Sequence, residues 1–173
     1  MDIGLARLTG TLFITATLAG VPGAALLGTT AGAALLLLMA AAIAMIPAAV
    51  FPVLRRHGEA AAAGYLAARV LEAVLLLPAV GGRQEDWTYA GGSLFFCLSA
   101  LILNTVLYRA RLVPRWISGW GLLAVAPYLT GAALVMCGVL GTSSPALFAL
   151  VVPLAVNEMA LAARLLAKGY TSV

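Results

Sequence analysis

Six long apolar runs, separated by short links, limit what this chain can fold into. A helix crosses the hydrocarbon core of a bilayer with about 20 apolar residues, and it satisfies its own backbone hydrogen bonds there. The sequence is 64% hydrophobic and only 9% charged, which sets it apart from soluble domains. We therefore predict an all-α membrane protein in which residues 1–173 form a single bundle of six transmembrane helices. The predicted helices cover residues 8–27, 32–54, 60–80, 87–108, 116–140 and 145–167.

The basic side chains predict how this bundle is oriented. With six crossings, eight of the ten fall on one side of the membrane, Arg83 falls on the other, and Arg69 lies within a span. Cytoplasmic loops carry the excess of Lys and Arg, so both termini are expected in the cytoplasm and the protein in the cell (inner or plasma) membrane. Since topology explains the net charge of +4, no nucleic-acid partner is expected. The eight residues are Arg7, Arg55, Arg56, Arg109, Arg111, Arg115, Arg164 and Lys168.

Residues that bind metals or react covalently are few. Cys97 and Cys137 each lie in an apolar run and are expected to be packing residues, whereas His57 is expected to be solvated in the link RRHGE. The sequence has no Asp-rich motif for magnesium and diphosphate, no GxSxG, no HExxH and no glycine fingerprint for a nucleotide. We therefore expect no cofactor and no metal, and find little support for redox, phosphoryl-transfer or metal-hydrolase chemistry.

Polar side chains within the third and sixth apolar runs break this pattern. Arg69 and Glu72 stand three residues apart in the third run, and therefore on one helical face. Asn157 and Glu158 lie in the middle of the sixth run, and Asn104 lies near the inner end of the fourth. A charge at the bilayer centre costs at least about 2.5 to 3.5 kcal/mol on insertion scales, so such residues normally face the protein interior and find partners.

The two glutamates are predicted to lie at similar depths in the membrane. At about 1.5 Å per residue, Glu72 lies roughly 18 Å from the cytoplasmic start of its helix and Glu158 roughly 14 Å from the cytoplasmic end of its own. If the third and sixth helices are neighbours, the two carboxyls can share one cavity. Arg69 favours an ionised Glu72, whereas Arg164, six residues from Glu158, faces another way, so Glu158 is the expected neutral, proton-donating acid. A pair between Arg69 and Glu158 would reverse that assignment.

Four deep aromatic rings are candidates to line a substrate cavity, together with the polar side chains Arg69, Asn157 and Asn104. Aromatic faces can stabilise a cationic intermediate. Ordinary packing within the bundle is the alternative for the rings, and a structural staple between helices is the alternative for the polar side chains. The four rings are Tyr65, Phe96, Trp120 and Tyr128.

Three segments of the sequence resemble a known family. They are FPVLRRHGEAAAAGYLAARVLEAVLLL, LYRARLVPRWISGWGLL and PLAVNEMALAARLLAKGY. Along nearly the whole chain, the sequence resembles a bacterial membrane family named domain of unknown function 4386, through the patterns R-x-x-E, R-x-x-P-x-W-x-x-x-W-G and N-E. The link between the third and fourth runs is shorter than in many members, and the family name implies no activity. A looser likeness, in architecture alone, is to small actinobacterial integral-membrane terpene cyclases of the drimentine type.

These features lead to one functional hypothesis and two alternatives. The hypothesis is a membrane-embedded cyclase or isomerase of an apolar prenyl (terpenoid) substrate, with Glu158 as the protonating acid and Glu72 as the second carboxylate. The first alternative is a small proton-coupled transporter with inverted three-helix halves, and the second is a non-catalytic lipid-binding protein. The expected partners are the lipid bilayer and a hydrophobic small molecule, and the sequence leaves a homo-oligomer open.

Overall fold

The computed structural model describes residues 3–83 and 85–171 and confirms the all-helical prediction. These residues form six helices, each long and apolar enough to cross a membrane, and no strand occurs among them. The chain is therefore a multi-pass membrane protein. The helices are α1 (Ile3–Ala25), α2 (Thr30–Leu54), α3 (Glu59–Val80), α4 (Asp86–Arg109), α5 (Arg115–Met136) and α6 (Pro145–Lys168).

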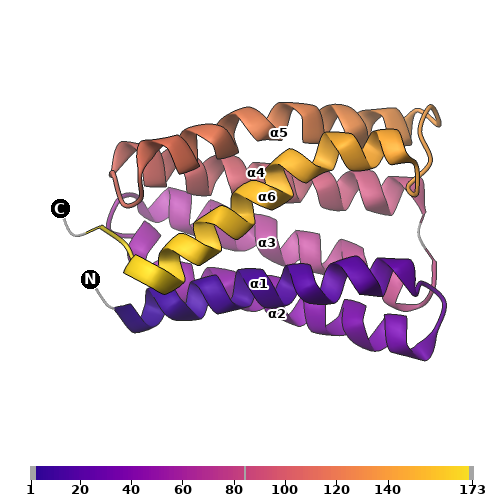
Figure 1. The fold of residues 1–173 in the computed structure, drawn as a ribbon, viewed down its shortest axis with the longest axis horizontal. Coiled ribbons are helices and arrows are strands. Elements are labelled where there is room, and N and C mark those ends of the chain that lie inside the picture. The colour runs from indigo at the N-terminus through magenta and orange to yellow at the C-terminus, as the bar shows by residue number, and fades with distance from the viewer. Residues whose placement is uncertain (1–2, 84, 172–173) are drawn as a thin grey trace.

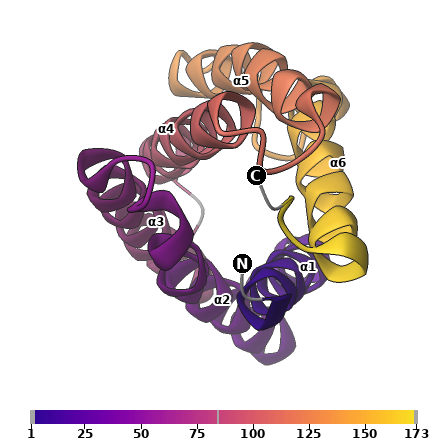
Figure 2. The same cartoon turned by 90° about the vertical axis from the view of Figure 1, so that its left-hand side faces the viewer.

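The helices pack in chain order into a closed ring (Figure 2). Each helix contacts the helix before it and the helix after it, and α6 completes the ring against α1. Consequently α3 and α6 are not neighbours in the ring, and they face each other across the centre of the bundle. In Figure 1, α1 begins and α6 ends at the same end of the bundle, as an even number of crossings requires. We call this the basic end, because the eight basic residues identified above fall there.

Capping residues and glycines set the helix ends. The hydroxyls of Thr29 and Ser144 accept hydrogen bonds from backbone N–H groups in the first turns of α2 and α6. α5 ends at Met136, earlier than the predicted residue 140, because Gly138 turns the chain with a φ of 70°. Cys137 is therefore exposed beyond the helix, and its prediction as a packing residue is wrong, whereas Cys97 is buried as expected.

Two glycines let α6 approach both of its neighbours closely. A Cβ atom at Gly10 of α1 would lie 2.8 Å from the carbonyl oxygen of Ala162 in α6. A Cβ atom at Gly131 of α5 would lie 2.9 Å from a methyl carbon of Leu147, also in α6. Small residues at such crossings are how membrane helices bring their backbones together. The closure of the ring against α1 therefore depends on glycine at position 10, where the close atom belongs to the backbone, whereas at Gly131 the end of the Leu147 side chain can rotate away.

The segment after α6 folds back over the basic end. Tyr170 is only 8% exposed and belongs to the largest apolar core of the bundle. Burial raises the pKa of its phenol to about 12, so the side chain stays neutral. The backbone N–H of Thr171 donates to the carbonyl of Leu112 at 2.7 Å, and Arg164 donates to the carbonyl of Gly169 at 3.0 Å. Residues 169–171 are thus fixed against the link between α4 and α5.

Candidate functional site

A buried arginine joins two glutamates at the centre of the ring. Arg69 of α3 is 2% exposed, and its Nη1 lies 3.1 Å from Oε2 of Glu72, one turn further along the same helix. Its Nη2 lies 2.8 Å from Oε1 of Glu158 on α6. These three residues, which we call the central ion cluster, tie together the two helices that face each other across the bundle. The predicted pairing of Arg69 with Glu72 is confirmed.

Three aromatic rings surround the guanidinium of Arg69. Its Cζ lies 5.5, 5.7 and 5.2 Å from the ring centroids of Phe13, Tyr65 and Phe96, which are distances typical of cation–π contacts. The Nε of Arg69 also donates to the hydroxyl of Tyr65 at 3.3 Å. The rings come from α1, α3 and α4, so four of the six helices meet at this cluster once α6 is included. The guanidinium thus has a polar or aromatic partner on each side.

Phe13 is the residue of this group that sequence reasoning missed. It is 1% exposed and lies in the middle of α1. The signal that could have found it is its position, because Phe13 is the sole aromatic residue of its helix and its neighbours one turn away on the same face, Gly10 and Ala16, are small. A large ring on a face of small residues is placed to project into the bundle.

The pairing of Glu158 with Arg69 corrects the earlier assignment of roles. Glu158 was expected to lack a cation, but its contact with Arg69, at 2.8 Å, is the shorter of the two ion pairs. Because Arg69 pairs with Glu158, the expected roles of the two glutamates reverse. Glu158 becomes the carboxylate held by the guanidinium, and Glu72 becomes the candidate to carry a proton.

The central ion cluster contains two carboxyl groups and one guanidinium group. Its charges balance when one proton is bound, and it carries one net negative charge when both carboxyls are ionised. An uncompensated charge in an apolar interior is costly, so the proton count of the cluster matters to its energy. The glutamate side chains are 11% and 16% exposed, against 2% for the arginine, so the carboxyls are the more accessible members. The arrangement is suited to exchanging one proton.

The two predicted asparagines serve other contacts. Asn157 donates through Nδ2 to the carbonyl of Ile117 in α5 at 2.7 Å, and Asn104 donates to the carbonyl of Ala100 in its own helix at 2.9 Å. The Oδ1 atoms of both amides are buried without a hydrogen-bond partner in the described part of the chain. The structure therefore places Asn157 at the packing of α6 on α5, although it adjoins Glu158 in the sequence.

The two remaining predicted rings, Tyr128 and Trp120, have different neighbours. Tyr128 of α5 packs against Phe96, with the ring centroids 5.0 Å apart and the planes tilted by 59°. It therefore extends the aromatic surroundings of Arg69 by one further ring. Trp120 instead stacks on Trp116 at 6.4 Å, near the start of α5.

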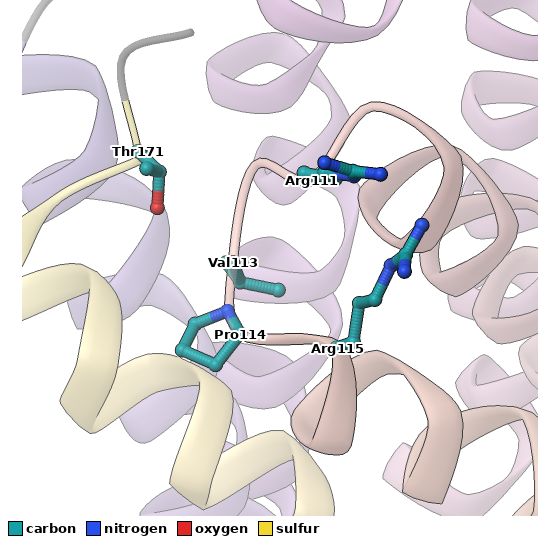
Figure 3. A pocket seen from close by; sticks show the side chains of 5 residues that line it. All are labelled: Arg111, Val113, Pro114, Arg115 and Thr171. Carbon is teal, nitrogen blue, oxygen red and sulfur yellow. The ribbon is translucent and has the colours of Figure 1, made fainter.

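Two surface pockets lie at opposite ends of the bundle, away from the central ion cluster. One has a volume of about 350 Å³ and lies at the basic end, beside Arg111, Arg115 and Thr171 (Figure 3). The other, of about 140 Å³, lies at the opposite end beside Tyr89 and Ser144. Neither is the apolar cavity that the cyclase hypothesis predicts around the carboxyls, so the existence of that cavity stays a prediction.

Comparison with known proteins gives one match. A family model described as a domain of unknown function (DUF4386) matches residues 83–169, half of the chain. The matched segment covers α4 to α6, so it includes Glu158 but not Arg69 or Glu72. The resemblance stated from the sequence is confirmed there and stays a prediction for the third helix. No curated protein and no solved structure matches the chain.

Proposed function

Because this chain belongs to the DUF4386 family, whose description gives no activity, we propose its function from the central ion cluster. The protein transfers a proton to, and removes one from, an apolar prenyl substrate within the membrane. The reaction class is cyclisation or isomerisation. The observation that carries the proposal is the pair of carboxyls that share one guanidinium in an apolar bundle.

Each member of the cluster has a role in this reaction. Glu72 donates its proton to a carbon–carbon double bond, which forms a C–H bond and leaves a carbocation on the neighbouring carbon. Glu158, ionised against Arg69, then removes a proton from a carbon adjacent to the cation, and a new double bond forms. Glu158 then releases its proton to the solvent and Glu72 takes one up, which restores the cluster. The reaction is redox-neutral and needs no co-reactant. General acid–base groups of this kind contribute about 10²- to 10⁴-fold to a rate.

The aromatic surroundings support the same chemistry. The faces of Phe13, Tyr65 and Phe96 already contact one cation, the guanidinium of Arg69. A carbocation formed beside the cluster meets the same rings, whose negative faces stabilise positive charge. The apolar helices also exclude the water that would otherwise capture the cation. Prenyl substrates reach such a site through the lipid phase.

The test uses the full chain in lipid nanodiscs with farnesyl and geranylgeranyl alcohols as probes, in heavy water. We expect one deuterium to enter each product molecule, because the initiating proton comes from an exchangeable carboxyl. Glu72→Gln and Glu158→Gln should each lower the rate by about 100-fold or more. Glu59→Gln is the matched control, because Glu59 is exposed at the start of the same helix as Glu72. Turnover that survives in both cluster variants contradicts the proposal.

A specific observation favours proton-coupled transport as the second candidate. Glu72 is the fourteenth residue of α3, counted from Glu59, and Glu158 is the fourteenth residue of α6, counted from Pro145. The halves α1–α3 and α4–α6 cross the membrane in opposite directions, so this pairing of acids is the pattern of inverted-repeat transporters. Proton movement into sealed proteoliposomes, abolished by Glu72→Gln, would favour this candidate. Turnover in unsealed membranes would favour the enzyme.

A further inference from the structure

The pocket at the basic end is built from the link between α4 and α5 and from the tail of the chain. Its lining residues are Arg111, Val113, Pro114, Arg115 and Thr171, and its volume is about 350 Å³ (Figure 3). It is a shallow depression that is open to its surroundings, and not an enclosed cavity. The tail side of the pocket is held in place, because Thr171 bonds to Leu112 through its backbone and lies 3.4 Å from Nη2 of Arg164 through its hydroxyl.

The two arginines of this pocket have no acidic partner among the described residues. Both side chains are exposed, and in residues 3–83 and 85–171 the ion pairs with carboxylates involve Arg69 alone. The guanidinium of Arg115 lies 5.3 Å from the ring centroid of Tyr108, which restrains its position. Two unpaired guanidiniums beside one pocket favour an anionic ligand with several acceptor oxygens.

Arg111 adopts a positive φ, a backbone conformation that is strained for a residue other than glycine. α4 ends in a turn in which the N–H of Leu112 donates to the carbonyl of Leu107 at 3.1 Å, and Arg111 has a φ of 52°. Glycine is the usual residue at this position of such a turn. The other described residues with positive φ are all glycines, namely Gly28, Gly58, Gly82, Gly138 and Gly169. An arginine kept at the strained position indicates that its side chain has a use.

The position of the pocket at the ends of two membrane-spanning helices is where lipid headgroups are expected. The pocket sits at the junction of two membrane-spanning helices, and Trp116, the residue after Arg115, is 62% exposed, as is typical of an interfacial tryptophan. α5 begins at Arg115 and is 22 residues long, so the positive end of its dipole also points at this region. Basic pockets between membrane helices are a known setting for anionic headgroups.

We propose that this pocket binds a phosphate group between Arg111 and Arg115, supplied by an anionic lipid headgroup or by a soluble phosphate compound. The two guanidiniums donate charge-assisted hydrogen bonds to the phosphate oxygens, and the start of α5, at Arg115, adds the positive end of its helix dipole. The site is independent of the central ion cluster and of the reaction proposed for it.

The test is a lipid titration of the full-length protein in neutral detergent, followed by native mass spectrometry. The probes are phosphatidylglycerol, phosphatidylcholine with the same acyl chains, and inorganic phosphate as a competitor. We expect phosphatidylglycerol to bind more tightly than phosphatidylcholine. The double variant Arg111→Gln with Arg115→Gln should weaken phosphatidylglycerol binding by at least about tenfold.

The matched control removes two charges elsewhere at the same end. Arg55 and Arg56 are both exposed in the link between α2 and α3, and Arg55→Gln with Arg56→Gln should change the affinity by less than about twofold. Arg111→Gly is a second variant, because it relieves the strained backbone while it removes the charge. It should weaken binding without lowering the melting temperature, which separates loss of the site from loss of the fold.

Three results decide the outcome. Arginine-dependent binding of phosphatidylglycerol that inorganic phosphate does not displace supports the site and identifies a lipid headgroup. Displacement by inorganic phosphate supports the site and identifies a soluble phosphate ligand. Equal losses in the 111/115 and 55/56 variants, or no loss in either, would overturn the proposal, because binding would then follow the total charge of the basic end.

Discussion

Arginine occurs in two contrasting settings in this protein. Arg69 lies at the bundle centre, 2% exposed, with two carboxylates and three aromatic rings around it. Arg111 and Arg115 lie exposed at the basic end with no carboxylate partner in the described residues. In the apolar interior the chain itself must supply every partner of a charge, whereas at the membrane surface water and lipid can do so. The same side chain is therefore part of the fold in one place and available to a ligand in the other.

The largest expected loss of stability follows from removing the positive charge of Arg69 at the centre of the bundle. Arg69→Met leaves two buried carboxyls without their cation, which should destabilise the fold by about 3 to 5 kcal/mol. Thermal unfolding in detergent measures this loss. The control is Arg69→Met combined with Glu72→Gln and Glu158→Gln, which removes all the charges and should recover much of the stability. If Arg69→Met alone melts like the unmodified protein, the cluster does not depend on its arginine.

A smaller effect compares buried and open positions within one helix. A Cβ atom at Gly121 of α5 would lie 2.5 Å from Oδ1 of Asn104, a buried side chain fixed by its bond to Ala100. Gly121→Ala should therefore force α4 and α5 apart and cost about 1 to 3 kcal/mol.

At Gly119, by contrast, the nearest atom would be 3.8 Å away, on Tyr108. Gly119→Ala should be neutral or stabilise the fold by up to about 1 kcal/mol, since alanine favours helix. Chemical denaturation of both variants measures the difference. Equal stabilities would show that the interface between α4 and α5 is loosely packed at Gly121.

The smallest expected effect is that of Arg111→Gly, which should stabilise the fold, whereas Arg69→Met and Gly121→Ala should destabilise it. Arg111→Gly should stabilise the fold by about 1 kcal/mol, because glycine adopts a positive φ without the steric cost that other residues carry. Arg109→Gly, two residues earlier and still inside α4, should instead destabilise it by up to about 1 kcal/mol. Matched denaturation curves test the pair. Destabilisation by Arg111→Gly would mean that the arginine side chain supports the fold itself.

The sequence predicts the spans of this fold well and their ends less well. Apolar runs of about 20 residues gave all six helices, since the bilayer requires that length. α1 includes Ile3 and Arg7, earlier than the predicted residue 8, because a long basic side chain can reach the membrane surface from within a helix. α5 stops before residue 140, because hydropathy does not show that Gly138 turns the chain.

For the central ion cluster, the sequence predicts the contact within one helix but not the contact between two helices. The three-residue spacing of Arg69 and Glu72 fixes their contact. The pairing of Arg69 with Glu158 depends on α3 and α6 facing each other across a ring, and no local pattern gives that arrangement. Asn157 turns toward α5 because one residue along a helix rotates the side chain by about 100°.

Infrared difference spectroscopy of the carboxyl groups in nanodiscs is the most direct test of a proton shared within the central ion cluster. At neutral pH we expect the C=O stretch of one protonated carboxylic acid per chain, which is lost in Glu72→Gln and retained in Glu59→Gln. A spectrum without a protonated carboxyl, or one that Glu72→Gln leaves unchanged, would contradict the proton-transfer role of Glu72 and Glu158.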